Sequence, residues 1–481
     1  MTTTATSADA GDFDDVPLVL DPHVTRLDGG RVLLGGDPGR LVRLRSTASS
    51  WATSRPTAPA RALGRALLDG GLAHPRPHPV PVLDVSVVVP VRDRADELDR
   101  CLRALGRQLP VLVVDDGSRD PAAVAGVCRR HGARVLALPA NGGPAAARNA
   151  GLAATSSALV AFVDSDCTPG PGWLAALLGH FADPSVGAVA PRVRGGVPPR
   201  VRGAVAPRVR SAGGTTLLAR YAAARGPLDL GPQEARVRPG GRVPYVPTAA
   251  LVVRRAALAG GPPFDPALRY GEDVDLVWRL HDAGWTVRYD PAVVVPHAEP
   301  DRWGAWLERR YRYGTSAAPL SARHGARLAP LVVPPWPTAA WLLLLAGRPL
   351  PALAAAVVPV VRLHRRLRRT GLPTATCARA AATATARGVL ATGSGLGGAG
   401  TVVTLPLLLA LLGPRPTRRA AAAALLAPPL LELLARRPAV DPVRWTALRL
   451  LDDVAYGAGV WRGCLRARSA SALRPRLTRP S

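Results

Sequence analysis

Four apolar runs alternate with helix-like segments between residues 85 and 166, and this alternation limits the possible fold more than any other feature. The runs are VSVVVPV (85–91), VLVVDDG (111–117), RVLALPA (134–140) and LVAFVDSD (159–166). Strands with continuous apolar residues are buried on both faces, as in a parallel sheet covered by helices. The helix-like segments between the runs can supply the crossovers that parallel strands need. We therefore expect an α/β domain with a mostly parallel sheet.

Acidic residues follow three of these four runs. They are Asp93, the pair Asp115 and Asp116, and the pair Asp164 and Asp166. In open α/β sheets, ligands bind at the carboxyl ends of the strands. Clustered carboxylates repel one another, and a divalent metal or a hydrogen-bonding nucleotide is the simplest partner for them. The Asp-x-Asp spacing alone is a weak signal, because many surface turns contain it.

Three further segments carry residues with two possible interpretations. NGGPAAARNAG opens a helix whose N-terminus, together with Arg148, suits a pyrophosphate, although an ordinary capped helix fits as well. GEDVDLVWRL begins with Glu272 and Asp273, which could complement the helix dipole or could include a general base. His297 ends the apolar run VVVPH, where a lone histidine is more often structural than a ligand.

The order of these segments resembles the inverting glycosyltransferases of family 2, which have the GT-A fold. VSVVVPVRDRADEL, VVDDGS, NGGPAAARNAG, FVDSD, GEDVDLVWRL and VVVPH follow one another, and the resemblance covers about residues 85–315. Six segments in order are far more specific than any one of them. The resemblance implies a nucleotide-sugar donor, with UDP-glucose as the expected one, and a divalent cation, Mg²⁺ or Mn²⁺.

The resemblance also implies a role for each residue. Asp273 would be the catalytic base, and Glu272 would position the acceptor. The metal would be held by Asp166, His297 and Asp164. In this family context, His297 is expected to be a ligand and not a structural residue. The nucleotide sugar would be bound by Pro90, Asp93, Asp115, Asp116, Arg148 and Asp164. Asp93 stands where many relatives have Asn.

A narrower resemblance concerns the layout of the whole chain. RLDGGRVLLGGDPGRLVRL, VVDDGSRDP, YGEDVDLVWRLHDAGW and RRYRYGTSAAPLSARH, with NGGPAAARNAGL, together resemble the glycosyltransferases of the mycofactocin system. This implies transfer of β-linked glucose to a peptide-derived redox cofactor of an actinobacterial pathway. A polyprenyl-phosphate or cell-wall glycan acceptor is an alternative within the same enzyme class. A catalytically inactive nucleotide-binding or scaffold protein is an alternative from another class.

The segments around the catalytic region divide the chain into four parts. Residues 1–15 are small, polar and acidic, and we expect disorder. Residues 16–82 are expected to form a small winged-helix-like module that recognises a peptide. The alternative is a module that only packs against the rest of the chain. The GT-A domain would occupy residues 83–315. An Arg-rich, hydrophobic, helical region would occupy residues 316–481 and would be associated with a membrane.

The charge distribution supports that last expectation. The net charge is +28, yet residues 302–481 hold 27 Arg against 5 acidic residues, so the catalytic half is nearly balanced and nucleic-acid binding is not expected. Residues 328–347 and 388–414 are uncharged and flanked by Arg, as in spanning or interfacial membrane segments. No secretory signal is recognisable at the N-terminus. We expect the protein to lie at the cytoplasmic face of the cell membrane, or in the cytoplasm if this region is a soluble helical domain.

Overall fold

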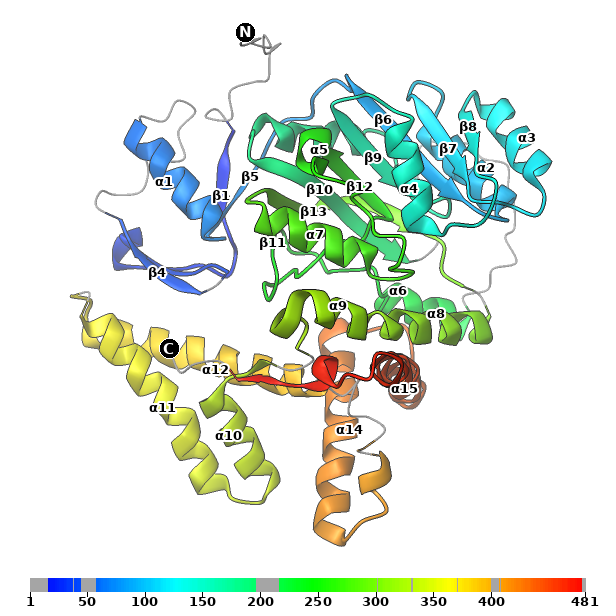
Figure 1. The fold of residues 1–481 in the computed structure, drawn as a ribbon. Helices are drawn as coiled ribbons and strands as arrows, with labels where there is room; N and C mark the ends of the chain where they lie inside the picture. The colour runs from blue at the N-terminus through cyan, green and yellow to red at the C-terminus, as the bar shows by residue number, and fades with distance from the viewer. Residues whose placement is uncertain are drawn as a thin grey trace. The chain divides into compact units, whose positions relative to one another are not determined.

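The chain forms two compact units, which are described separately (Figure 1). The first contains Met1–Arg210 and Arg225–Glu299, and the second contains Ser211–Ala224 and Pro300–Ser481. The computed structural model describes residues 16–37, 39–44, 58–195, 216–300, 302–329, 332–369, 371–398, 406 and 408–477. Residues 1–15, for which we expected disorder, lie outside this set.

The first unit begins with a small module of short strands around one helix. Strands β2 (Thr25–Leu27), β3 (Val32–Gly35) and β4 (Arg40–Arg43) form an antiparallel sheet, and β1 (Leu18–Leu20) pairs with β5 (Ala73–Pro75). Helix α1 (Ala58–Asp69) contributes Leu67 to a core shared with Leu33 and Leu72. The winged-helix-like character remains a prediction, because residues 45–57, between β4 and α1, are not described.

The centre of the first unit is a sheet of eight strands in the order β11-β13-β10-β12-β9-β6-β7-β8. The expected parallel sheet is confirmed for β6, β7, β8 and β9, and β10 and β13 also pair in parallel. Strands β12 and β11 pair antiparallel with their neighbours. The bounds are β6 Val85–Val91, β7 Val111–Asp115, β8 Arg134–Ala137, β9 Leu159–Val163, β10 Val186–Gly195, β11 Ala235–Val237, β12 Ala250–Arg254 and β13 Thr286–His297.

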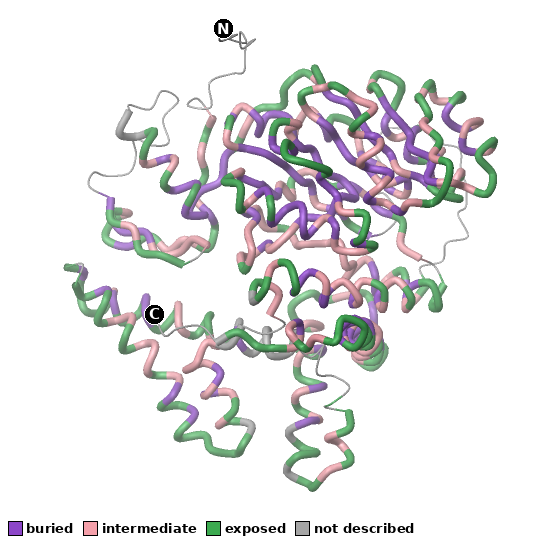
Figure 2. The backbone as a smooth tube through the Cα atoms, viewed as in Figure 1, coloured by how far each residue is buried: buried purple, intermediate pink, exposed green. Residues whose placement is uncertain are grey.

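Helices cover both faces of this sheet, which explains why its strands are buried along most of their length (Figure 2). Helices α2 (Ala95–Leu105), α3 (Pro121–His131) and α5 (Trp173–Leu178) share one core with Val87, Val89 and Val113. Helix α4 (Pro144–Ala153) lies on the opposite face. A Cβ at Gly151 would stand 2.3 Å from Val88 Cγ1, so the close approach of α4 to the sheet requires glycine there.

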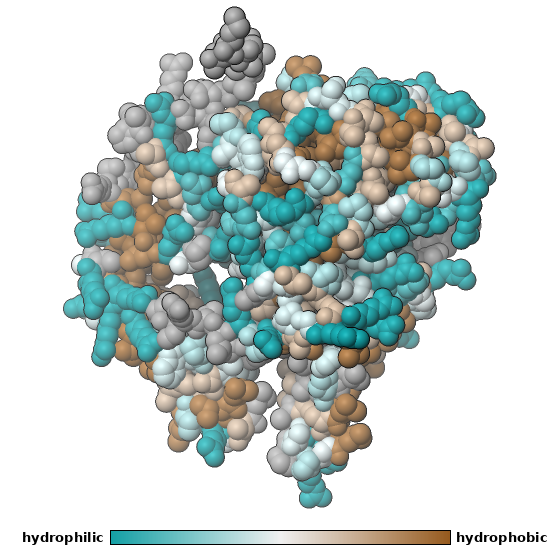
Figure 3. Space-filling model, viewed as in Figure 1, coloured by the Kyte–Doolittle hydropathy of each residue, from teal (hydrophilic) through white to brown (hydrophobic). Residues whose placement is uncertain are grey.

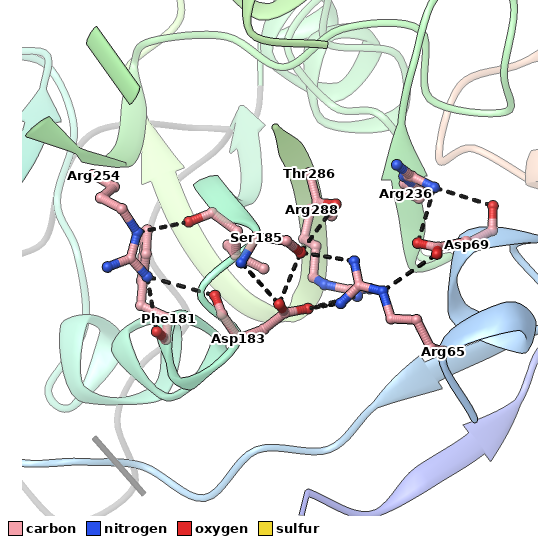
Figure 4. Close-up of polar contacts among 10 residues, drawn as sticks. Arg65, Asp69, Phe181, Asp183, Ser185, Arg236, Arg254, Thr286 and Arg288 are labelled. Carbon is pink, nitrogen blue, oxygen red and sulfur yellow. Dashed lines mark hydrogen bonds and ion pairs between the residues drawn. The ribbon is translucent and has the colours of Figure 1, made fainter. Parts of the chain in front are cut away.

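The small module is bound to the catalytic sheet by a network of arginines and carboxylates (Figure 4). Asp183 is buried, and its Oδ2 accepts a 2.8 Å hydrogen bond from Arg65 Nη1 of α1. The guanidinium of Arg288 on β13 lies 3.8 Å from the same oxygen, and burial lowers the pKa of Arg288 to about 10. A second contact joins Arg236 of β11 to Asp69 of α1 at 3.2 Å. These contacts join α1 to the eight-stranded sheet.

The second unit is helical, and its tightest contact joins α8 to α15. Cβ atoms at Gly314 and Gly459 would stand 2.1 Å and 2.0 Å from backbone carbonyl oxygens of the facing helix, so glycine permits this crossing. Arg310 of α8 forms a buried ion pair with Asp452 of α15, which also accepts from the hydroxyl of Tyr221. The bounds are α6 Leu217–Ala224, α8 Trp303–Thr315, α9 Ala317–His324, β14 Val332–Val333, α10 Pro335–Leu345, α11 Pro349–Arg368, α12 Thr374–Gly398, α14 Arg415–Arg436, α15 Pro442–Arg466 and β15 Arg476–Leu477.

Two uncharged runs, 328–347 and 388–414, were expected to be spanning or interfacial membrane segments. Among the described residues, no helix combines the length and the apolar character that crossing a bilayer requires. The uncharged run at 328–347 is divided by its prolines, and α10 keeps only 11 residues of it. Part of the run at 388–414 lies outside the described residues. Helices α10, α11 and α14 nevertheless carry exposed leucines, and apolar side chains gather on their visible surface (Figure 3).

Candidate active site

The candidate site lies at one edge of the eight-stranded sheet. Strands β6, β7 and β9 are parallel, and β13 runs in the same direction because two antiparallel steps, through β12, connect β9 to β10. The carboxyl ends of all four strands therefore meet at this edge. This topology brings His297, at the end of β13, to the edge that holds Asp164 and Asp166 after β9.

The acidic pair after β7 shapes two neighbouring turns. Asp115 Oδ1 accepts from the backbone N–H of Ser118 at 3.0 Å. Asp116 accepts from the backbone N–H groups of Gly142 and Gly143, at 2.7 Å and 2.8 Å. Both carboxylates are buried. Asp116 thus ties the end of β7 to the Gly-rich turn that starts α4, where a nucleotide diphosphate would be expected to approach.

Asp93 holds the third turn of this edge. Its φ is 56°, its Oδ1 accepts from the backbone N–H of Arg119 at 2.7 Å, and its own N–H donates to Ser118 Oγ at 2.9 Å. Pro90 lies in β6, opposite Val114 of β7. The predicted nucleotide-binding residues of β6 and β7 are therefore neighbours, and their contact with a nucleotide stays a prediction.

Arg148 joins two carboxylates of the site. It is buried on α4, where its Nη1 donates to Glu272 Oε1 at 2.8 Å and its Nη2 donates to Asp164 Oδ1 at 2.7 Å. Its guanidinium also lies over the ring of Phe264, 5.7 Å from the centroid. Burial alone would lower the pKa of Arg148, but these two carboxylates raise it, so the side chain stays charged.

Asp273 follows Glu272 in the first turn of α7 (Glu272–Asp282). It is partly buried, and its Oδ1 accepts from the backbone N–H of Val274 at 2.8 Å. Burial, followed by the neighbouring charge of Glu272, raises the pKa of Asp273 to about 7. A carboxylate with a pKa near neutrality is suited to accept a proton from a hydroxyl group. Glu272 is buried against Arg148, so in this arrangement it fixes the guanidinium.

Asp166 and His297 lie together on the other side of the edge. Asp166 Oδ1 is 3.4 Å from His297 Nε2, and the backbone N–H of Ala298 donates to the carbonyl of Asp166. The Nδ1 of His297 is 3.4 Å from the carboxylate of Glu299, which sequence reasoning did not select. His297 thus lies between two carboxylates.

Asp166 and His297 could supply two ligands to one divalent cation. Asp166 Oδ1 is buried and accepts no hydrogen bond from the described residues, so a cation would satisfy it. Asp164, the third predicted ligand, directs its Oδ1 to Arg148 instead. Within the described ranges, no cluster of three or more His, Cys, Asp or Glu is arranged to hold a metal ion. Further ligands would therefore come from a bound phosphate or from water.

Arg94 was also missed by sequence reasoning. It precedes α2, and its Nη1 donates to Asp166 Oδ2 at 2.7 Å. In a chain whose 62 basic residues are all Arg, composition gives no reason to single out one of them.

Comparison with known proteins shows the family to which the chain belongs. The model of glycosyl transferase family 2 matches residues 86–256. A pre-mycofactocin glycosyltransferase from Mycobacterium tuberculosis (strains CDC 1551 and H37Rv) is 40% identical over 96% of this chain and 98% of the relative. The chain belongs to the pre-mycofactocin glycosyltransferase family, within glycosyltransferase family 2. Its first unit therefore has a GT-A-like α/β fold.

Other similar proteins match a smaller share of this glycosyltransferase. The N-acetylglucosaminyl-diphospho-decaprenol L-rhamnosyltransferase of Mycobacterium tuberculosis is 32% identical over 42% of this chain and 71% of the relative. The solved mannosyltransferase PcManGT from Pyrobaculum calidifontis, in complex with GDP-Man and Mn²⁺, is 22% identical over 75% of this chain and 88% of that chain. Its TM-score of 0.38 is too low to support conclusions about this chain.

Proposed function

We propose that this family 2 glycosyltransferase transfers glucose from a nucleotide sugar, UDP-glucose, to a peptide-derived redox cofactor, mycofactocin or its precursor. The observation that carries the proposal is the 40% identity that extends over nearly the whole length of a pre-mycofactocin glycosyltransferase. That match covers 96% of this chain, whereas two other relatives match 48% and 42% of it. The product would be a β-linked oligosaccharide.

The proposed reaction is a single displacement that inverts the anomeric carbon. Asp273 accepts the proton of the acceptor hydroxyl, whose oxygen forms a bond to the anomeric carbon. The bond from that carbon to the diphosphate oxygen breaks, and its electron pair stays on the diphosphate. The buried Arg148 holds Asp164 and Glu272 in place, so that Asp273 stands in a fixed, partly dehydrated position beside the sugar.

Asp166 and His297 would hold the divalent cation, which supplies charge stabilisation for the departing diphosphate. The imidazole ligand favours Mn²⁺ over Mg²⁺, because Mg²⁺ takes oxygen ligands. Asp115, Asp116, Asp93 and Pro90 would form the nucleoside side of the donor pocket. We keep residues 83–315 as the proposed extent of the catalytic domain.

The proposed function is tested by incubating the purified chain with UDP-glucose and the peptide-derived acceptor, followed by mass spectrometry. We expect a ladder of hexose additions with wild-type protein and none with Asp273→Asn. Asp282→Asn, at the exposed end of the same helix, is the matched control and should retain transfer. Full transfer by Asp273→Asn would refute the role of the base, and wild-type protein that glycosylates no such acceptor would refute the substrate.

A polyprenyl-phosphate acceptor is the second candidate, favoured by the similarity to the decaprenol-linked rhamnosyltransferase. Radiolabelled nucleotide sugar should distinguish the two. Label that enters the organic phase of membrane incubations would support the lipid acceptor, whereas label in a small polar product would support the proposed function.

We also propose that the second unit contacts the cytoplasmic face of the membrane as a peripheral surface. Residues 309–431 contain 16 Arg and no acidic residue. Leu350 at the start of α11 is 78% exposed, and Leu412, just before α14, is 86% exposed. Exposed leucines in a region rich in arginine suit anionic lipid headgroups, and the shared positive charge disfavours pairing with a second copy of the chain.

Sedimentation with vesicles tests this contact. We expect binding to vesicles of phosphatidylglycerol, weaker binding to phosphatidylcholine, and reduced binding of the Leu350→Glu and Leu412→Glu variants. Equal sedimentation with both lipids, or none with either, would contradict the proposal.

The small module is proposed to recognise the peptide part of the acceptor. Strand β4 lies at the edge of its sheet and is largely exposed, so a peptide strand could pair with it. Because α1 shares buried ion pairs with the catalytic sheet, a point substitution is a cleaner test than deletion of the module. Leu41→Asp should raise the KM for the peptide-derived acceptor and leave donor hydrolysis unchanged. An unchanged acceptor KM would refute peptide recognition at β4.

A further inference from the structure

Asp164 and Asp166 each accept a hydrogen bond from one arginine. The two arginine side chains differ in how exposed they are. Arg148 is only 4% exposed in its side chain and is held by Asp164, Glu272 and the ring of Phe264. The side chain of Arg94 is 47% exposed, and the hydrogen bond described for it goes to Asp166 Oδ2. Arg148 is therefore a fixed part of the site, whereas Arg94 can move at little cost in packing.

The charges around Asp166 change when a donor binds. A divalent cation on Asp166 and His297 would repel a guanidinium bound to the same carboxylate, because the charges are alike and close. A diphosphate brings negative oxygen atoms, two of which the planar fork of an arginine can bind at once. Since Arg94 lies at the start of α2, beside the turn that holds Asp93, it remains near the expected diphosphate after leaving Asp166.

We propose that Arg94 is a donor-binding residue that neutralises Asp166 until the nucleotide sugar enters and then binds the terminal phosphate of its diphosphate. The inference rests on the proposed function and adds a residue to it. During transfer, the electron pair of the broken bond stays on a diphosphate oxygen, and the charge of Arg94 balances it. Arg94 thus acts twice, first as a counterion for the site and then as a ligand for the leaving group.

The proposal predicts opposite effects on the cation and on the diphosphate. In Arg94→Gln, the affinity for Mn²⁺ alone, measured by electron paramagnetic resonance, should rise because a competing charge is removed. The preference for UDP over UMP, measured by calorimetry, should fall by about tenfold, because one charge-assisted hydrogen bond to the terminal phosphate is lost. Arg94→Lys should retain part of this preference. Arg100→Gln, on the exposed face of α2, is the matched control and should resemble the wild-type protein.

Two outcomes separate this inference from the proposed function. If wild-type protein prefers UDP over UMP and Arg94→Gln keeps that preference, Arg94 is only a structural partner of Asp166 and the inference is overturned. The inference is overturned in that case even if the affinity for Mn²⁺ changes, since an ion pair alone explains such a change. If wild-type protein binds no nucleoside diphosphate in a panel of UDP, GDP and dTDP, the proposed function itself fails. Thermal unfolding of each variant checks that the fold is retained.

Discussion

Protonation of Asp273 should switch off transfer at mildly acidic pH. Burial and the charge of Glu272 raise the pKa of this carboxyl group from 3.8 to about 7. A base must be ionised to accept a proton, so at pH 6 only about a tenth of the protein would carry an active base, and at pH 5 about a hundredth. The acidic limb of kcat/KM should therefore fall about tenfold per pH unit below neutrality.

The neighbouring carboxylate gives a second, directional prediction. In Glu272→Gln, the like charge beside Asp273 disappears while Arg148 and the burial remain, so the acidic limb should move to lower pH. The variant also loses a hydrogen bond to Arg148, and its maximal rate should fall. Initial rates with UDP-glucose between pH 5 and 9, at constant ionic strength, measure both changes.

The pH dependence of the free energy of unfolding provides an independent check. Because the folded-state pKa of Asp273 is raised, ionisation opposes folding, and the free energy of unfolding should fall as pH rises from about 4 through about 7. Asp273→Asn removes this term, so the variant should be more stable than the wild-type protein at pH 8 and similar to it at pH 4. A wild-type rate profile that is flat between pH 5 and 7, or an Asn variant that is less stable at pH 8, would refute the reasoning.

Three further substitutions test other parts of the structure by chemical denaturation and activity. Asp183→Asn should destabilise the first unit by about 1–3 kcal/mol, because the buried Arg288 and the partly exposed Arg65 lose a charged partner, whereas the half-exposed Asp69→Asn should cost under about 1 kcal/mol. Gly459→Val should unfold the second unit at lower denaturant, since its Cβ meets a carbonyl oxygen at 2.0 Å, while Gly388→Ala in open space should not. Asp116→Ala should leave the backbone N–H of Gly142 without this acceptor and that of Gly143 with Asn141 Oδ1 at 3.1 Å, and should weaken donor binding about tenfold or more.

The amino-acid sequence predicted the parallel strands β6, β7, β8 and β9 and most residues of the candidate site. Apolar runs of five to seven residues, separated by amphipathic segments, have few ways to bury themselves other than a helix-covered sheet. The ends of β6, β7 and β9 then place Asp93, Asp115 and Asp164 at one edge without further information. These features are local in the chain, and local patterns are what a sequence displays.

Tertiary structure decided which of those residues act together. The pairing of Arg148 with both Asp164 and Glu272 joins positions 16 and 124 residues apart, and no spacing rule connects them. Arg94 and Glu299 became visible only through their contacts with Asp166 and His297. The same limit affected the helical unit, where uncharged length suggested a membrane span. Helix α10 begins at Pro335, and a turn at Gly347 separates it from α11, so the uncharged run forms an α-helix of only 11 residues. Prolines and turns, and not hydropathy alone, set where a helix begins and ends.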